Sequence, residues 1–183
     1  MHRLNLLAAL TQYNRAYPAE ADVASRFITF VQEHADCFER SLAIGHITGS
    51  AWVVDAAGQR ALFTHHRKLN RWLQPGGHAD GDPDVRNVSL REAQEESGLH
   101  TLEFVSPHIF DLDAHRIPAR GAEPAHIHYD VRFALRAVGN EPLVLSQESH
   151  ELAWFTMAEI ADRFGDESVL RMMRKWKRNF DRK

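Results

Sequence analysis

The pattern of hydrophobic and polar positions divides the chain into a helical start, a strand-rich middle and a helical end. Within residues 3–38, Ala24, Phe27, Ile28 and Val31 recur at steps of three and four, which places them on one apolar stripe of a helix. Pro18 lacks a backbone N–H and is expected to separate two helices in this part.

From about residue 42 the pattern changes to that of strands. Apolar and β-branched residues dominate 44–54, the turn-forming run 56–59 follows, and 60–66 is expected to pair as the partner strand. The sequence further predicts a loop at 74–77, a helix at 83–97 ended by Gly98, strands at 104–115, 126–137 and 152–156, and two final helices.

The order of these elements predicts the fold class. In the strand 126–137, apolar Ile127, Tyr129 and Val131 alternate with polar neighbours, so one face is buried and the other is polar. Strands mixed with helices indicate an α+β fold, an α/β/α sandwich with a mixed sheet. We expect residues 1–38 to be a helical N-terminal extension packed on a domain formed by residues 39–183, which includes the C-terminal helix.

Composition excludes several other classes of protein. The chain has 183 residues and a formal net charge of −3, so its overall charge does not favour nucleic acid or membrane surfaces. Its one cysteine, Cys37, excludes an intrachain disulfide and a thiolate zinc cage. No apolar run approaches the roughly 20 residues that cross a bilayer. We therefore expect a cytoplasmic protein without a membrane partner.

The most informative segment is the predicted helix 83–97. At about 100° per residue, Glu92, Glu95 and Glu96 share one face, whereas Leu90 and Ala93 face the opposite side, toward a core. Three neighbouring carboxylates repel one another, and a cation between them reverses that cost. Carboxylate oxygens favour Mg²⁺ or Mn²⁺.

Two other interpretations of these glutamates remain open at this point. Ser89 and Glu92 have the spacing of a capping box, so Glu92 could simply complete a helix start. A glutamate-rich helix face is also common on solvated surfaces.

The wider segment resembles a known family. Gly77 followed by the run Arg91-Glu92-Ala93-Gln94-Glu95-Glu96-Ser97-Gly98-Leu99 has the residues and spacing of the Nudix box, and the resemblance extends over about residues 40–165. It implies a loop-helix-loop on an α/β/α sandwich. The implied activity is that of a Nudix hydrolase, a divalent-metal-dependent pyrophosphohydrolase. Such an enzyme cleaves a phosphoanhydride bond of a nucleoside diphosphate linked to another moiety, by means of metal-activated water.

One position departs from the family pattern. Pro83 stands where the family has its first glutamate, between Asp82 and Asp84. Asp82 as the N-cap with Pro83 at the first helical position makes a good helix start. We interpret the change as a structural substitution that retains activity.

The resemblance also assigns roles to single residues. It implies that Glu92, Glu95 and Glu96 bind the metal, that one of them orients or deprotonates water, and that Arg91 positions Glu92. Further metal ligands are expected from the Gly76 carbonyl and from a later acidic residue, for which Glu148 is the candidate and Glu151 the rival. The expected substrate-binding residues are Arg67 (with Lys68), Trp72, Gly77, His128 and Arg132.

Histidines alternate with other residues on the predicted strands. His126 and His128 share a strand face, as do Asp111, Asp113 and His115 if that segment is extended. This alternation could build a transition-metal site. We favour a polar sheet face that lines the substrate cleft, because the glutamates already supply a metal site.

The expected partner is a small nucleotide derivative, and because Nudix enzymes are often dimers, a homodimer is one option. Two alternatives stay open: a non-catalytic nucleotide sensor on the same fold, supported by Pro83 alone, and a hydrolase that removes caps from RNA. The second depends on the basic residues at 171–183. Nucleic acid is the less favoured partner, because basic residues at a helix C-terminus commonly complement its dipole.

Overall fold

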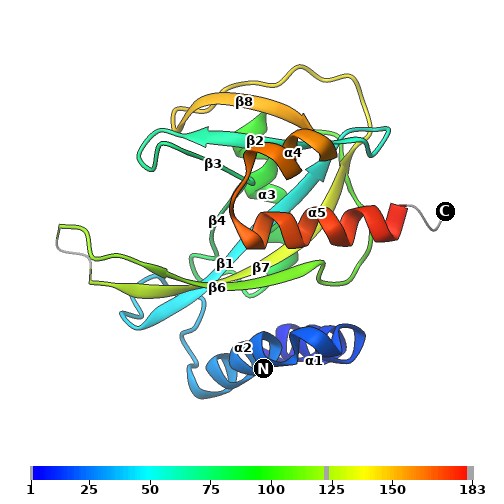
Figure 1. Ribbon diagram of the computed structural model, residues 1–183. Coiled ribbons are helices and arrows are strands. Elements are labelled where there is room, and N and C mark those ends of the chain that lie inside the picture. Colours follow the sequence, from blue (N-terminus) through cyan, green and yellow to red (C-terminus); the bar gives the residue numbers. More distant parts are fainter. Residues whose placement is uncertain (1, 122–123, 181–183) are drawn as a thin grey trace. The chain divides into compact units, whose positions relative to one another are not determined.

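The computed structural model describes residues 2–121 and 124–180, and it shows the predicted α+β class, a mixed sheet flanked by helices (Figure 1). The strand order is β3-β2-β1-β7-β5, with β4 on β1, β6 on β7 and β8 on β2. The helices are α1 (Leu4–Ala16), the 3₁₀ turn η1 (Pro18–Glu20), α2 (Ala21–Glu33), α3 (Val85–Ser97), α4 (Met157–Arg163) and α5 (Glu167–Phe180). The strands are β1 (Gly45–Val54), β2 (Arg60–His66), β3 (Arg71–Leu73), β4 (Gly76–His78), β5 (Leu102–Phe104), β6 (Asp111–Ile117), β7 (His126–Ala137) and β8 (Ser149–Thr156).

The described chain divides into two compact units. The first comprises the described parts of 1–50, 76–89 and 106–133, and the second those of 51–75, 90–105 and 134–183. β1, α3 and β7 each contribute residues to both units. Among the described residues, no helix is long and apolar enough to cross a membrane.

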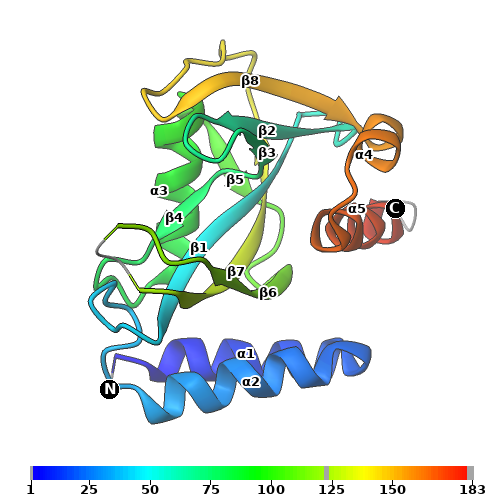
Figure 2. The same cartoon turned by 60° about the vertical axis from the view of Figure 1, so that its left-hand side comes forward.

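In the first unit, the two N-terminal helices lie side by side (Figure 2). In the predicted apolar stripe of α2, Ala24, Phe27 and Val31 are fully buried and Ile28 is half-buried; Leu10 of α1 is also fully buried. Phe30 of α2 stacks on Tyr129 of β7, with ring centroids 3.9 Å apart, and Phe27 meets the same ring edge-on. These aromatic contacts join α2 to the sheet of the first unit.

The strand registers of the first unit bring four strands together. β4 pairs antiparallel with β1 so that His78 lies opposite Thr48 and Gly76 lies opposite Ser50. β6 pairs antiparallel with β7 so that His115 lies opposite His128. Since directly opposed residues point to the same face, these registers collect the polar side chains of the strands on one face.

The second unit is built around β2, which pairs antiparallel with β8 along its length and with β3 at its end. Val169, Met172, Met173 and Trp176 of α5 are buried, and the Trp176 indole donates a hydrogen bond to the Gly58 carbonyl over 2.8 Å. The C-terminal helix is therefore fixed to the turn between β1 and β2.

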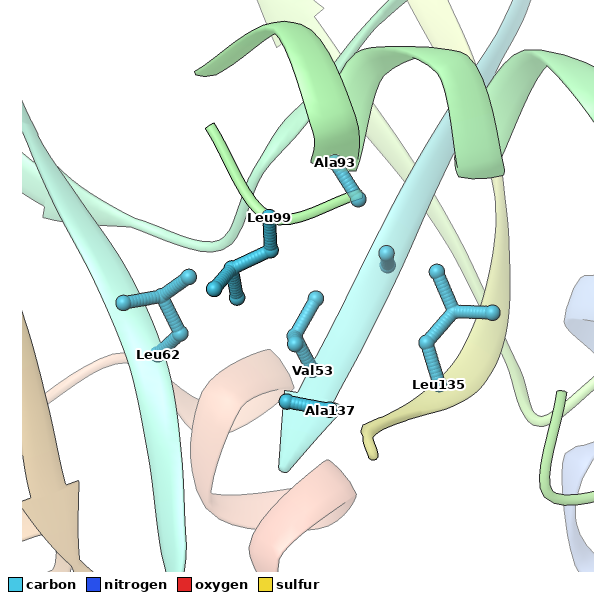
Figure 3. Close-up of a cluster of buried hydrophobic side chains, with 7 residues drawn as sticks. Val53, Leu62, Ala93, Leu99, Leu135 and Ala137 are labelled. Atoms are coloured by element: carbon cyan, nitrogen blue, oxygen red, sulfur yellow. The ribbon is translucent and has the colours of Figure 1, made fainter. Parts of the chain in front are cut away.

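The core of the second unit gathers side chains from α3, β1, β2 and β7 (Figure 3). Val53, Leu62, Leu99 and Leu135 point toward one another, and Ala93 reaches the cluster from α3. Ala93 is fully buried and Leu90 packs against the same cluster, as the helix periodicity predicts.

Most predicted element boundaries agree with the structure within a few residues, and two do not. The segment 104–115 is not one strand: β5 ends at Phe104 and β6 begins at Asp111. Pro107 lies between them and cannot donate to a strand ladder. The predicted loop at 74–77 is also partly wrong, because Gly76 and Gly77 begin β4.

The start of α3 is a third correction. The helix begins at Val85, and its N-terminal cap is Asp84, whose carboxylate accepts a hydrogen bond from the Asn87 N–H over 3.1 Å. Asp82 instead accepts from the Asp84 N–H over 2.9 Å in an Asx turn, so Pro83 precedes the helix. The capping-box interpretation of Ser89 is also wrong, because Ser89 lies inside the helix and donates to the Arg86 carbonyl.

Candidate active site

The carboxylate face of α3 is oriented by the core of the second unit. Leu90 and Ala93 face that core, and helix geometry turns Glu92, Glu95 and Glu96 to the other side. Glu95 is exposed, whereas Glu92 and Glu96 are half-buried. The three carboxylates predicted to share a face therefore do so, with two of them partly shielded from water.

Arg91 contacts the first of these glutamates. Its guanidinium donates to Glu92 Oε1 over 2.9 Å, and the Glu92 side chain is 17% exposed. A charge-assisted bond of this kind holds a carboxylate in one orientation. This contact is the one expected from the sequence for Arg91.

The C-terminal end of α3 is tied to the segment that leads into β8. Gly98 adopts φ +72°, as a C-terminal glycine cap does. Val144 packs so closely against it that a Cβ at position 98 would lie 2.5 Å from the Val144 Cβ. The Val144 N–H donates to the Ser97 carbonyl over 2.8 Å. Glu141 accepts from the backbone N–H groups of His100 and Thr101, which also holds the segment.

This anchored segment carries Glu148, and it meets Arg67 after β2. The Arg67 N–H donates to the Glu148 carbonyl over 2.9 Å, and its side-chain Nε donates to the Ser149 carbonyl over 2.7 Å. Both side chains are exposed. The second unit therefore brings together Arg67 and Glu148, which lie far apart in the sequence.

Trp72, on β3, is half-buried in the same unit. Its ring stacks on His65 with centroids 5.1 Å apart and meets Phe155 edge-on at 5.0 Å. Its aromatic surface is thus already partly covered by protein.

The remaining predicted residues, Gly76, Gly77, His128 and Arg132, belong to the first unit. Gly76 and Gly77 form β4 rather than a free loop. A Cβ at Gly76 would lie 2.8 Å from the Ser50 Cα, so β4 approaches β1 more closely than any side chain allows. This close pairing is a structural reason for glycine at position 76.

Arg132 lies within a buried ionic network. Its guanidinium contacts Asp130 at 2.7 Å, Asp111 at 3.2 Å and Asp113 at 3.4 Å, and its side chain is 3% exposed. Burial by itself would lower the pKa of Arg132, but the three carboxylates outweigh burial and raise it. Asp130 also accepts from Thr48 and Ser50. Arg132 therefore organises the polar strand face, and its contact with a phosphate stays a prediction.

Two histidines of the first unit had no place in the predicted site. His46 on β1 and His78 on β4 lie beside His128, and the three rings offer nitrogens that all lie within 4.8 Å of one another. The alternation of His46, Thr48 and Ser50 marked a polar strand face, but only the β1–β4 register shows that His78 joins it.

An Arg-Glu-x-x-Glu-Glu helix on a mixed sheet flanked by helices defines a class of acid-anhydride hydrolases. The NUDIX domain model matches residues 46–180, so this chain belongs to the Nudix family and is a hydrolase that acts on pyrophosphate bonds. No curated protein sequence matches the chain.

Solved structures show the same fold. A C. elegans Ap4A hydrolase in a binary complex is similar with a TM-score of 0.60 and 16% identity, over 74% of this chain and 97% of that one. An E. coli dihydroneopterin triphosphate pyrophosphohydrolase matches with a TM-score of 0.56 and 15% identity, over 69% of this chain and 91% of that one. A NUDIX-family hydrolase from Clostridium perfringens matches with a TM-score of 0.52 and 18% identity, over 72% of this chain and 96% of that one.

Proposed function

We propose that the chain is a divalent-metal-dependent pyrophosphohydrolase that cleaves a phosphoanhydride bond in a nucleoside diphosphate linked to another moiety. The observation that carries this proposal is the face of α3 that bears Glu92, Glu95 and Glu96, oriented by Ala93 in the core. Oxygen donors in this number suit Mg²⁺ or Mn²⁺. When bound, such an ion supplies charge neutralisation for a diphosphate and lowers the pKa of water.

The side chains around this face divide the remaining tasks. Arg91 holds Glu92 by a charge-assisted bond, so that carboxylate keeps its orientation. Glu95, the exposed member, is free to contact solvent and is the candidate to accept a proton from water. Preorganised groups of this kind lower a barrier because they need no reorientation during the reaction.

Arg67 and Glu148 are proposed as additional site residues. The Arg67 side chain is exposed, and its Nε donates to the Ser149 carbonyl, so its terminal nitrogens suit a phosphate. Val144 binds the backbone at the end of α3, and Glu148 follows four residues later in the sequence. This link to α3 supports Glu148 as an additional metal ligand. Gly76, Gly77, His128 and Arg132 stay predictions for ligand contact.

The test is a hydrolysis assay of the full chain on a panel of nucleotide derivatives with Mg²⁺, with Mn²⁺ and with EDTA. The panel includes Ap4A and dihydroneopterin triphosphate, after which two of the structural neighbours are named. It also includes nucleoside diphosphate sugars, capped RNA and dinucleotides. Products are resolved by chromatography. We expect metal-dependent release of a monophosphate from at least one member.

Glu96→Gln and Glu92→Gln are expected to reduce this rate by about 100-fold or more, the scale seen when one charge-stabilising group is removed. The matched control is Glu33→Gln, at the exposed end of α2, which should retain full activity. Binding of a panel member without cleavage by the wild type would contradict the proposal and favour the sensor. Selective cleavage of capped RNA would place the chain among cap-removing enzymes.

A further inference from the structure

Five histidines converge on one face of the sheet in the first unit. His46 comes from β1, His78 from β4, His115 from β6, and His126 and His128 from β7. The β1–β4 register places His78 opposite Thr48, one pleat from His46, and the β6–β7 register places His115 opposite His128. The glutamate helix contributes none of these residues.

The approach of β1 to β7 completes the cluster. The Ile127 N–H donates to the Ile44 carbonyl over 3.1 Å, and a Cβ at Gly45 would lie 2.4 Å from the Ile127 oxygen. Gly45 therefore allows the two strands to meet directly beside His46. The ring centroids of His46, His78 and His128 lie 4.9 to 5.0 Å from one another.

The state of His46 is unusual for a buried polar side chain. It is 1% exposed, and within the described part of the chain neither of its ring nitrogens makes a hydrogen bond of normal geometry. The Leu42 backbone favours the protonated form of His46, but burial and the neighbouring histidines outweigh it and lower its pKa. Buried polar atoms in native proteins are nearly always satisfied, and an ion is one of the few explanations for exceptions.

His46 and His128 are also in the charge state that a metal requires. Burial, together with His78 and other neighbouring histidines, lowers the pKa of His46 to about 4 and that of His128 to about 2. Neutral imidazole presents a lone pair, which is the form that ligates metal.

His126 supports His128 in a defined orientation. Its Nδ1 lies 2.9 Å from the Pro124 carbonyl, which can only accept, so this nitrogen carries the proton and Nε2 keeps a lone pair. That Nε2 lies 3.2 Å from Nε2 of His128. His128 therefore donates its Nε2–H to this lone pair. A ligand histidine that donates its other ring N–H to a neighbouring acceptor is the usual arrangement around bound metals.

We propose that His46, His78 and His128 form a second metal site, separate from the glutamates, which binds a transition-metal dication of the Zn²⁺ type. Three imidazole nitrogens without carboxylate or thiolate favour Zn²⁺, Co²⁺ or Ni²⁺ over Mg²⁺. The ligand nitrogens already lie within 4.8 Å of one another, and an ion bound at about 2.0–2.1 Å would draw them closer together. Because β1, β4 and β7 each supply a ligand, the ion would cross-link three strands.

The proposed site gives His128 a different role from the substrate contact predicted by the sequence. It also stands independently of the proposed hydrolase activity, because every ligand comes from the first unit and its test reads metal binding directly.

The test uses the full chain, stripped with EDTA and then supplied with Zn²⁺ or Co²⁺ in the presence of excess Mg²⁺. After gel filtration, elemental analysis should find close to one Zn²⁺ per chain. The Co²⁺ form should show the intense visible bands of a tetrahedral or five-coordinate site. X-ray absorption of the wild-type zinc protein should show nitrogen ligands at about 2.0–2.1 Å with imidazole scattering. This last measurement needs no variant.

His78→Gln and His128→Gln are expected to weaken Zn²⁺ binding by at least about 100-fold, since loss of an outer-shell partner alone costs about 10- to 100-fold. Their folding is checked by circular dichroism. His100→Gln, at an exposed position in the other unit, is the matched control and should bind as wild type. Replacement of Glu92, Glu95 and Glu96 by Gln should leave zinc binding unchanged. Absence of bound Zn²⁺ in the wild type, oxygen-only ligation, or loss of zinc on changing the glutamates would each overturn the proposal.

Discussion

Arg132 donates its Nε–H to Asp130 Oδ2, two residues earlier on β7, over 2.7 Å, while both side chains are only 3% exposed. The same guanidinium contacts Asp111 and Asp113 on β6. A cation intended for a phosphate normally lies on an accessible surface, whereas this one joins two strands through carboxylates.

The first prediction concerns this network. Arg132→Ala should lower the free energy of unfolding by about 3–5 kcal/mol, because it leaves buried carboxylates without their cation. Urea denaturation measures the change. Arg116→Ala on β6 is exposed and should change stability by less than about 0.5 kcal/mol. Similar small effects of both variants would show that the network contributes little to stability.

Gly45 provides the second prediction. A Cβ there would lie 2.4 Å from the Ile127 oxygen, at a backbone φ of +152°, so Gly45→Ala must push β1 from β7. We expect a loss of about 1–3 kcal/mol or more, the usual effect of overpacking. Thermal unfolding followed by circular dichroism measures it. Gly165→Ala meets no atom within 4 Å and should be neutral or slightly stabilising. Equal melting temperatures for the two variants would refute the close approach.

The start of α3 gives the third prediction. Asp84→Ala should destabilise the protein by about 1 kcal/mol, because the Asn87 N–H loses its capping acceptor. Asp82→Ala removes the Asx-turn bond and an exposed 3.3 Å bond from the Asn87 side-chain amide, but no bond to a backbone N–H of the helix, and should cost less. The reverse order in a urea titration would show that the helix begins earlier, at Pro83.

Cys37 gives a prediction for pH. The thiol is fully buried, and burial raises its pKa to about 11 despite the opposing charge of Arg3. An unfolded thiol ionises near about 8.5. The raised pKa therefore contributes stability below that pH, and the contribution is lost as pH rises toward 11. Alkylation at pH 8, followed by mass spectrometry, should be slow in the native protein and fast in urea.

Cys37→Ala is the matched variant for that experiment. It should remove part of the loss of stability between about pH 8.5 and 11, because the group that titrates is gone. Fast alkylation of the native wild type would mean that the thiol is accessible and ionised, contrary to its burial.

The last prediction concerns the C-terminal helix. Trp176→Phe removes the hydrogen bond to the Gly58 carbonyl and should cost about 1–3 kcal/mol, through a buried acceptor left unsatisfied and some lost packing. Lys177→Ala, at the exposed neighbouring position, should cost less than about 0.5 kcal/mol. If the two variants unfold at the same urea concentration, the helix is not fixed through its indole.

Some features of this protein follow from its sequence because they depend on short-range geometry. The 3.6-residue period of α3 is enough to turn Glu92 and Glu96 away from Leu90, and the alternation along 126–137 is enough to define the polar face of β7. The contact of Arg91 with Glu92 needs only adjacent positions on one helix. The Nudix box has the same local character, and this is why it is recognisable in one sequence.

Other features were decided by the tertiary structure, since they depend on strand registers and competing partners. The sequence pattern favoured Asp82 as the helix cap, whereas the hydrogen bonds of the structure select Asp84. Arg132 could have faced a ligand, but β6 supplied two carboxylates that hold it inside. His46, His78 and His128 are separated by long stretches of chain. Only the registers around β1 and the close approach at Gly45 bring their rings together.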